Sequence, residues 1–90
     1  MEIIWRAAAL NDLESIRDFI AQDNPRASAR VRTAVDRLAQ HPGLGRTGRV
    51  EATRELIIST VPYIVAYRVV ESQVRILAVI HTSRQWPQRF

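Results

Sequence analysis

Apolar residues alternate with polar ones, or run together, in three short stretches of the second half of the chain. Stretches of this length and period are typical of β-strands. They cover residues 53–58, 62–70 and 74–81, and the connections between them are too short to hold a helix. Consecutive strands with such short connections pair antiparallel. Residues 2–6 form another β-prone segment, which we predict to join the same sheet.

Two amphipathic helices are predicted between these strands. In residues 8–22 the apolar side chains recur at three- and four-residue spacing, and they are Leu10, Leu13, Ile16, Phe19 and Ile20. Asn24 is suited to the N-cap of the next helix and Pro25 to its first position. The second apolar stripe extends to about Gln40 and consists of Ala27, Val31, Ala34, Val35 and Leu38. So short a break between two helices predicts an antiparallel hairpin.

The order of these elements defines the fold class as α+β, β-α-α-β-β-β, with the helix hairpin packed on one face of a four-stranded antiparallel sheet. Residues 41–49 hold all three glycines and are predicted to be a loop. They lack the Gly-Lys-Ser or Gly-Lys-Thr of a phosphate-binding loop. Ninety residues suffice for one modest core, so we predict a single domain, residues 1–90.

The two long strands are apolar on both faces. With strict alternation, the face toward the helices consists of Tyr63, Val65, Tyr67, Val69, Val74, Ile76, Ala78 and Ile80. The opposite face then consists of Ile64, Ala66, Arg68, Val70, Arg75, Leu77, Val79 and His81. Because only one helical layer is available, a partner is predicted to cover this opposite face, as exposed apolar patches mark interfaces. Replacing Leu77 or Val79 with Asp is then expected to weaken the complex without unfolding the chain.

All thirteen basic residues are arginine, and the net charge is +4. Arginine binds carboxylates and phosphates through two parallel hydrogen bonds, so the charge reflects either solvated helix faces or an acidic protein or nucleic-acid partner. Cysteine is absent, which fits a reducing cytoplasm. The apolar runs are too short to cross a bilayer, and residues 1–6 do not resemble a secretory signal. We therefore predict a cytoplasmic protein with no cofactor, no metal and no membrane contact.

One group of side chains is suited to ribonuclease chemistry. Cleavage of RNA through its 2′-hydroxyl needs a general base, a general acid and a cation near the phosphorane charge. Histidine can serve as acid or base near neutral pH, and arginine can hold the phosphate. The candidates on or beside the open face are Arg54, Arg68, His81 and Arg84, with Tyr63, Glu55 and Trp86 nearby. In the structural alternative, His81 is a half-buried strand residue, and Arg54 and Arg68 pair with Glu55, Glu51 or Glu71.

Several motifs along nearly the whole chain resemble those of the RelE/ParE superfamily of type II toxins, and the ParE branch is the most similar. The motifs are Asp12-Leu13, Asn24-Pro25, Gly45-Arg46, Thr53-Arg54-Glu55-Leu56, Pro62-Tyr63-Ile64-Val65, Tyr67-Arg68-Val69 and the stretch from Ile80-His81 to Arg84. The resemblance implies a small bacterial toxin that is held inactive by an antitoxin encoded beside it. The antitoxin of such a pair wraps the toxin with its C-terminal segment, while its N-terminal half dimerises and binds operator DNA.

The target that the resemblance implies depends on the branch. ParE-type members inhibit DNA gyrase and trap it on cleaved DNA, whereas RelE-type members cut mRNA in the ribosomal A site. Ribonuclease members carry an arginine early in the middle strand, where this chain has Ile64, and catalytic groups after the last strand, where it has Thr82 and Ser83. Arg84 does match the arginine that follows the last strand in those ribonucleases.

The resemblance thus favours a gyrase inhibitor that acts by binding. One alternative is a ribosome-dependent ribonuclease that uses Arg68, His81 and Arg84, and another is a member that binds its antitoxin and poisons nothing. The implied antitoxin is a ribbon-helix-helix protein with an acidic C-terminal segment, and the toxin itself is not expected to bind DNA sequence-specifically. The residues predicted to contact antitoxin or target are Arg54, Ile64, Arg68, Leu77, Val79, His81, Arg84 and Trp86.

Overall fold

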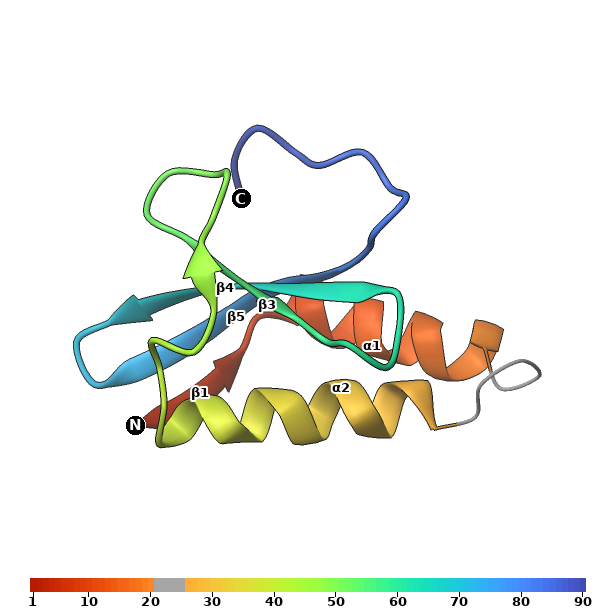
Figure 1. Ribbon diagram of the computed structural model, residues 1–90, viewed down its shortest axis with the longest axis horizontal. Coiled ribbons are helices and arrows are strands. Elements are labelled where there is room, and N and C mark those ends of the chain that lie inside the picture. The colour runs from red at the N-terminus through yellow and green to blue at the C-terminus, as the bar shows by residue number, and fades with distance from the viewer. Residues whose placement is uncertain (21–25) are drawn as a thin grey trace.

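A computed structural model describes residues 1–20 and 26–90, with a pair of helices packed under one face of a twisted sheet (Figure 1). The elements are β1 (Glu2–Trp5), α1 (Ala7–Ile20), α2 (Ala27–Asp36), a 3₁₀ turn (Arg37–Ala39), β2 (Arg46–Thr47), β3 (Arg54–Ile57), β4 (Tyr63–Val70) and β5 (Gln73–His81). The strand order in the sheet is β1-β5-β4-β3-β2. The predicted α+β class is confirmed, and the predicted elements follow one another in the predicted order.

The sheet differs from the predicted one in two respects. It is mixed, because β1 pairs parallel with β5 while the other strand pairs are antiparallel. A parallel neighbour requires a long crossover, and most of the chain, including both helices, lies between β1 and β5. It also has a fifth strand, since β2 forms inside the stretch predicted to be a loop.

Tyr67 holds the chain that leads into β2 close to the sheet. Its hydroxyl donates to the Pro42 carbonyl oxygen at 2.8 Å and accepts the Gly45 N–H at 2.8 Å. A Cβ at Gly45 would lie 2.6 Å from the Tyr67 hydroxyl and 2.9 Å from the Glu55 carbonyl oxygen. The close approach therefore requires glycine at this position, and this explains one of the three glycines of the segment.

The helices bury one side each against the sheet. α1 packs on β5 and α2 contacts β4. In α2 the predicted stripe is confirmed, since Ala27, Val31, Val35 and the following Leu38 are buried. In residues 7–16, the part of α1 whose side chains are described, the buried positions are Ala9 and Ile16, whereas Leu10, predicted to be in the core, is exposed. The predicted cap at Asn24 and Pro25 lies outside the described residues.

A β-bulge in β5 changes which of its side chains face the helices. Ala66 pairs with Ala78 but Tyr67 pairs with Ile76, so Leu77 is an extra residue without a partner of its own. An extra residue shifts the alternation by one position. Val79 therefore lies opposite Val65 and belongs to the helix-side core, and His81 lies opposite Tyr63 on the same face. The face assignments of Ala78, Val79, Ile80 and His81 made by strict alternation are wrong for this reason.

The face of the sheet away from the helices is covered by the chain itself. Ile64, Ala66, Ala78 and Ile80 lie on this far face, and all are buried although they stand apart from the helix-side core. Residues 48–53 and the C-terminal residues 82–90 arch over it (Figure 1). The expectation that a partner must supply this cover is wrong, because alternation along a strand does not reveal where an irregular tail will fold.

Candidate functional site

The side chains predicted to contact a partner do not form one surface. They divide among the cleft between α1 and β5 (Val79, His81, Arg84), the far face and its cover (Ile64, Leu77, Trp86) and the half of the sheet nearer the β4–β5 hairpin (Arg54, Arg68). Ile64, Leu77 and Val79 are buried, so they are not accessible in the isolated chain. Of these three regions, only the α1–β5 cleft holds several polar side chains that line one cavity.

The α1–β5 cleft has a volume of about 550 Å³. β1 ends opposite Ile76, whereas β5 continues to His81, so the later part of β5 has an edge that β1 does not pair. Asp12 of α1 approaches this edge and accepts the Val79 N–H through Oδ2 at 3.0 Å. The polar lining of the cleft consists of Asp12, Ser15, Tyr63, His81, Ser83 and Arg84.

The tautomer of His81 is set by Ser83. The Ser83 backbone N–H donates to Nδ1 at 3.1 Å, and Ser83 Oγ lies 2.7 Å from the same nitrogen. Because an amide N–H can only donate, Nδ1 is an acceptor and the proton of the neutral ring is on Nε2. The ring packs edge-on against Tyr63 with 5.3 Å between centroids. Burial raises the pKa of the Tyr63 hydroxyl, and the positive charge of Arg84 offsets only part of that rise, so the phenol remains a donor at neutral pH.

The cleft therefore offers hydrogen-bond donors and one cation to an anionic group, but it lacks a residue of the predicted ribonuclease set. Arg68 pairs with Arg75, whereas His81 pairs with Tyr63. Five residues of strand separate Arg68 from Tyr63, which is about 17 Å at the usual rise per residue. Arg68 instead donates from Nε to the Ala52 carbonyl oxygen at 3.3 Å. His81 and Arg84 come together, and Arg68 does not join them.

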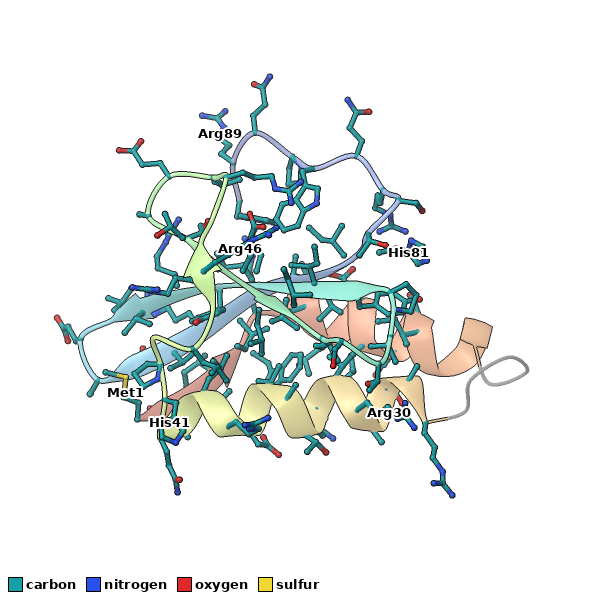
Figure 2. All side chains as sticks on the ribbon, in the orientation of Figure 1. Met1, Arg30, His41, Arg46, His81 and Arg89 are labelled. Carbon is teal, nitrogen blue, oxygen red and sulfur yellow. The ribbon has the colours of Figure 1, made fainter. Side chains whose placement is uncertain are left out.

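The ion pairs also differ from the predicted alternative, in which Arg54 and Arg68 pair with a glutamate. Glu55 is buried and binds Arg46 at 3.0 Å and Arg49 at 3.1 Å. Arg54 donates to the Gly45 carbonyl oxygen at 2.8 Å. The sequence identified Glu55 as a pairing residue but gave the wrong partners, because β2 and the segment after it bring Arg46 and Arg49 to its far-face side chain. Figure 2 places Arg46 above the sheet, on the side away from the helices.

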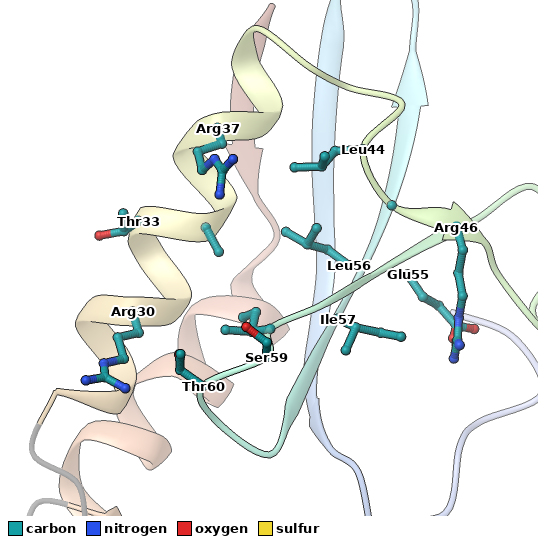
Figure 3. Close-up of a pocket in the computed structure, with 13 residues that line it drawn as sticks. Arg30, Thr33, Arg37, Leu44, Arg46, Glu55, Leu56, Ile57, Ser59 and Thr60 are labelled. Atoms are coloured by element: carbon teal, nitrogen blue, oxygen red, sulfur yellow. The ribbon is translucent and has the colours of Figure 1, made fainter.

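A second cavity, which sequence analysis missed, lies between α2 and β3. It is a groove of about 690 Å³, with Arg30 and Arg37 on the helix side and Leu56 and Ile57 on the strand side (Figure 3). β2 pairs only with Arg54 and Glu55. Among the described residues, no strand pairs with the outer edge of β3 beyond them, so that edge borders the groove. Ile57 is 52% exposed here.

One sequence signal could have indicated the groove. Arg30 and Arg37 are seven residues apart, which places them on the same side of a helix. The other half of the groove depends on β2 ending after two residues. That short strand could not be predicted, because a Tyr67 hydroxyl distant in sequence fixes its approach.

The described part of the chain meets neither of two simple requirements, one for a metal-binding cluster and one for a membrane-spanning helix. Within residues 1–20 and 26–90, no three His, Cys, Asp or Glu side chains are grouped so as to hold a metal ion. No helix in the same ranges has the length and apolar content needed to span a bilayer.

The described residues thus form a two-helix, five-stranded α+β domain with an arginine-lined groove and a polar cleft. Residues 3–86 match the family model described as ParE toxin of type II toxin-antitoxin system, parDE. The chain therefore belongs to the ParE toxin family, and the predicted superfamily and branch are confirmed.

Two curated relatives and one solved structure carry related names. The chain is 47% identical to "Putative toxin Y4kP" of Sinorhizobium fredii, over 96% of this chain and 93% of that one. It is 37% identical to "Toxin RelE2" of Caulobacter vibrioides, over 92% of this chain and 97% of that one. The solved structure "Chromosomal ParDE TA system from P. aeruginosa" is similar with a TM-score of 0.70 and 22% identity, covering 90% of this chain and 95% of that one, which establishes the shared fold.

Proposed function

We propose that this ParE-family toxin inhibits DNA gyrase by binding it, and that a cognate ParD-like antitoxin with an acidic C-terminal segment neutralises it through the α2–β3 groove. The observation that supports the antitoxin site is the open edge of β3 beside Arg30 of α2 and Arg37 of the 3₁₀ turn that follows it. Membership of a family defined by a toxin–antitoxin pair supports the existence of the partner.

The groove suits an acidic segment that adds to the sheet. An extended segment can hydrogen-bond to the free backbone of β3, as in other cases of strand addition. Leu56 and Ile57 provide apolar contact, and Arg30 and Arg37 provide charge for carboxylates of the incoming segment. In the described chain neither arginine forms an ion pair with a carboxylate, since the only such pairs involve Glu55. No carboxylate of the described residues therefore competes with an incoming segment for these two guanidinium groups.

Charge reversal of the two groove arginines tests the antitoxin site. We expect Arg30→Glu combined with Arg37→Glu to weaken binding of the cognate antitoxin by at least tenfold, because two charge-assisted contacts become repulsive. Arg32→Glu is the matched control, since Arg32 lies on the same helix but lines a different cavity. Isothermal titration calorimetry would measure the antitoxin affinity of the double variant and of the Arg32→Glu control. Equal affinity for the two proteins would refute the groove as the antitoxin site.

Gyrase inhibition has a direct assay. With gyrase, ATP and plasmid, the purified chain should block supercoiling and cause cleaved DNA to accumulate, and addition of the antitoxin should restore supercoiling. Normal supercoiling at micromolar toxin, with antitoxin binding intact, would exclude gyrase as the target while leaving the antitoxin proposal unaffected.

A second candidate function is ribosome-dependent cleavage of mRNA, because one relative is named Toxin RelE2 and because His81, Arg84 and Tyr63 share a cleft. Codon-phased cuts that disappear with His81→Ala or Arg84→Ala would support it. Arg68→Ala is the matched control, since Arg68 lies outside the cleft and should leave cleavage unchanged. Intact mRNA on translating ribosomes would exclude this activity.

A further inference from the structure

The C-terminal residues 82–90, which we call the strap, cover the far face of the sheet through very few attachments. Two backbone hydrogen bonds hold its start, from Thr82 N–H to the Pro62 carbonyl oxygen at 3.0 Å and from Arg84 N–H to the His81 carbonyl oxygen at 2.9 Å. In the described chain, residues 85–90 form no hydrogen bond to the rest of the protein. The remainder of the strap is thus retained by side-chain contacts alone.

The principal contact is a stack of Arg49 on Trp86. The Arg49 guanidinium carbon lies 4.0 Å from the centre of the Trp86 ring, and Phe90 packs edge-on against the same ring at 6.3 Å. Arg49 is itself fixed, because its backbone N–H, Nε and Nη2 all donate to the buried carboxylate of Glu55, at 2.7, 3.1 and 3.2 Å. Glu55, Arg49 and Trp86 therefore form a latch that joins the sheet to the strap.

On the face of the sheet over which the strap and residues 48–53 arch, an apolar row continues to the sheet edge (Figure 1). Ile57, Ile64 and Ile80 lie side by side on β3, β4 and β5. Ile64 and Ile80 are buried, whereas Ile57, at the open end of the row, is half exposed. A strap that leaves the sheet would extend this exposed patch across three strands, and contiguous apolar patches of that kind are typical of interaction surfaces.

We propose that the strap is a releasable cover, latched by Glu55–Arg49–Trp86, which opens while the sheet and helices remain folded and so exposes the row Ile57–Ile64–Ile80. The helix-side core does not include any residue of the strap or of this row, so release leaves that core intact. Release of the strap from the sheet does not depend on which target the toxin binds.

Release can be measured as the rate at which trypsin removes residues 85–90, because proteolysis of a rapidly opening segment follows the population of the open form. Trp86→Leu keeps an apolar side chain and leaves the Glu55–Arg49 pair in place, but removes the cation–π contact. We expect it to raise the cleavage rate after Arg84 by roughly three- to thirtyfold, the range of a cation–π contact. The midpoint of urea unfolding, followed by the circular dichroism of the sheet and helices, should change little.

Arg75→Gln is the matched control, since Arg75 is an exposed arginine of β5 outside the latch, and it should cleave at the wild-type rate. Arg49→Gln should also raise the cleavage rate after Arg84, although it weakens the Glu55 pair as well, and adding Trp86→Leu to it should give no further increase in that rate. The wild-type chain supplies an independent measurement: amides of residues 82–90 should exchange with solvent much faster than those of β4 and β5. Equal cleavage of Trp86→Leu and Arg75→Gln, or exchange of strap and sheet as one cooperative unit, would overturn the proposal.

Discussion

At the scale of single residues, Glu55 organises the far side of the sheet. Burial alone would raise the pKa of this carboxyl, but hydrogen bonds from the Arg49 side chain and backbone and from Arg46 together outweigh burial, and the pKa lies below its usual value. The anion is thus stabilised in the folded state although only 2% of the side chain is exposed. A buried carboxylate is retained in a small protein only when it is paired in this way.

Replacing Glu55 with Gln tests this role. The amide keeps the shape but loses the charge, so the hydrogen bonds from two arginines are no longer charge-assisted, and we expect a loss of roughly 2–3 kcal/mol in unfolding free energy. Because the folded-state pKa of Glu55 is depressed, its contribution is present above the unfolded pKa near 4.5 and is lost as the pH falls through the folded pKa.

Urea denaturation at pH 7 and at pH 3 measures both effects. The stability difference between wild type and Glu55→Gln should shrink at the lower pH. A difference that stays constant with pH would mean that the carboxylate charge is not what stabilises the latch.

At the scale of elements, β5 is the strand whose face assignment cannot be predicted from its sequence. Its apolar run through Leu77, Ala78, Val79 and Ile80 allows either face, so the pattern itself contains no sign of a bulge. The pairing with β4 decides the matter, because the small Ala66 and Ala78 lie opposite each other while the large Tyr67 faces Ile76 and reaches the Pro42 loop. Register of this kind depends on the neighbouring strand and not on local propensity.

The same strand pair contains a cross-strand repulsion. Arg68 and Arg75 are directly opposite, and like charges in that position are destabilising. We expect Arg75→Glu to raise the unfolding free energy by about 0.2–1 kcal/mol, and the gain should diminish in high salt because the site is partly exposed. Thermal unfolding of wild type, Arg75→Glu and Arg75→Gln would be compared at two salt concentrations. Arg75→Gln only removes the repulsion from Arg68, whereas Arg75→Glu also adds an attraction to it. A lower stability for Arg75→Glu than for Arg75→Gln would contradict the pairing.

At the scale of the whole molecule, the chain forms three layers: helices, sheet and a thin irregular cover. The core that holds the fold together lies between the helices and the sheet, and Val79 is part of it. A partner is therefore not needed to complete the monomer, and the family's partner is better sought at the open edge of β3.

Val79→Asp distinguishes a core position from a surface one. Burying an unpaired charge costs several kcal/mol, against a total stability of roughly 5–13 kcal/mol for a chain of this size. We expect the isolated variant to be largely unfolded or severely destabilised by circular dichroism, whereas Ile57→Asp, at an exposed position, should fold normally. A well-folded Val79→Asp protein would support the original surface assignment.

The sequence by itself determined the helix pair and the three C-terminal strands, because apolar periodicity and short turns are local properties. The family was indicated by the resemblance of its short motifs. Tertiary structure alone decided the parallel place of β1, the bulge at Leu77, the partners of Glu55 and the cover over Ile64 and Ile80. Each of these depends on contacts between segments far apart in sequence, and those contacts select among arrangements that the local pattern permits.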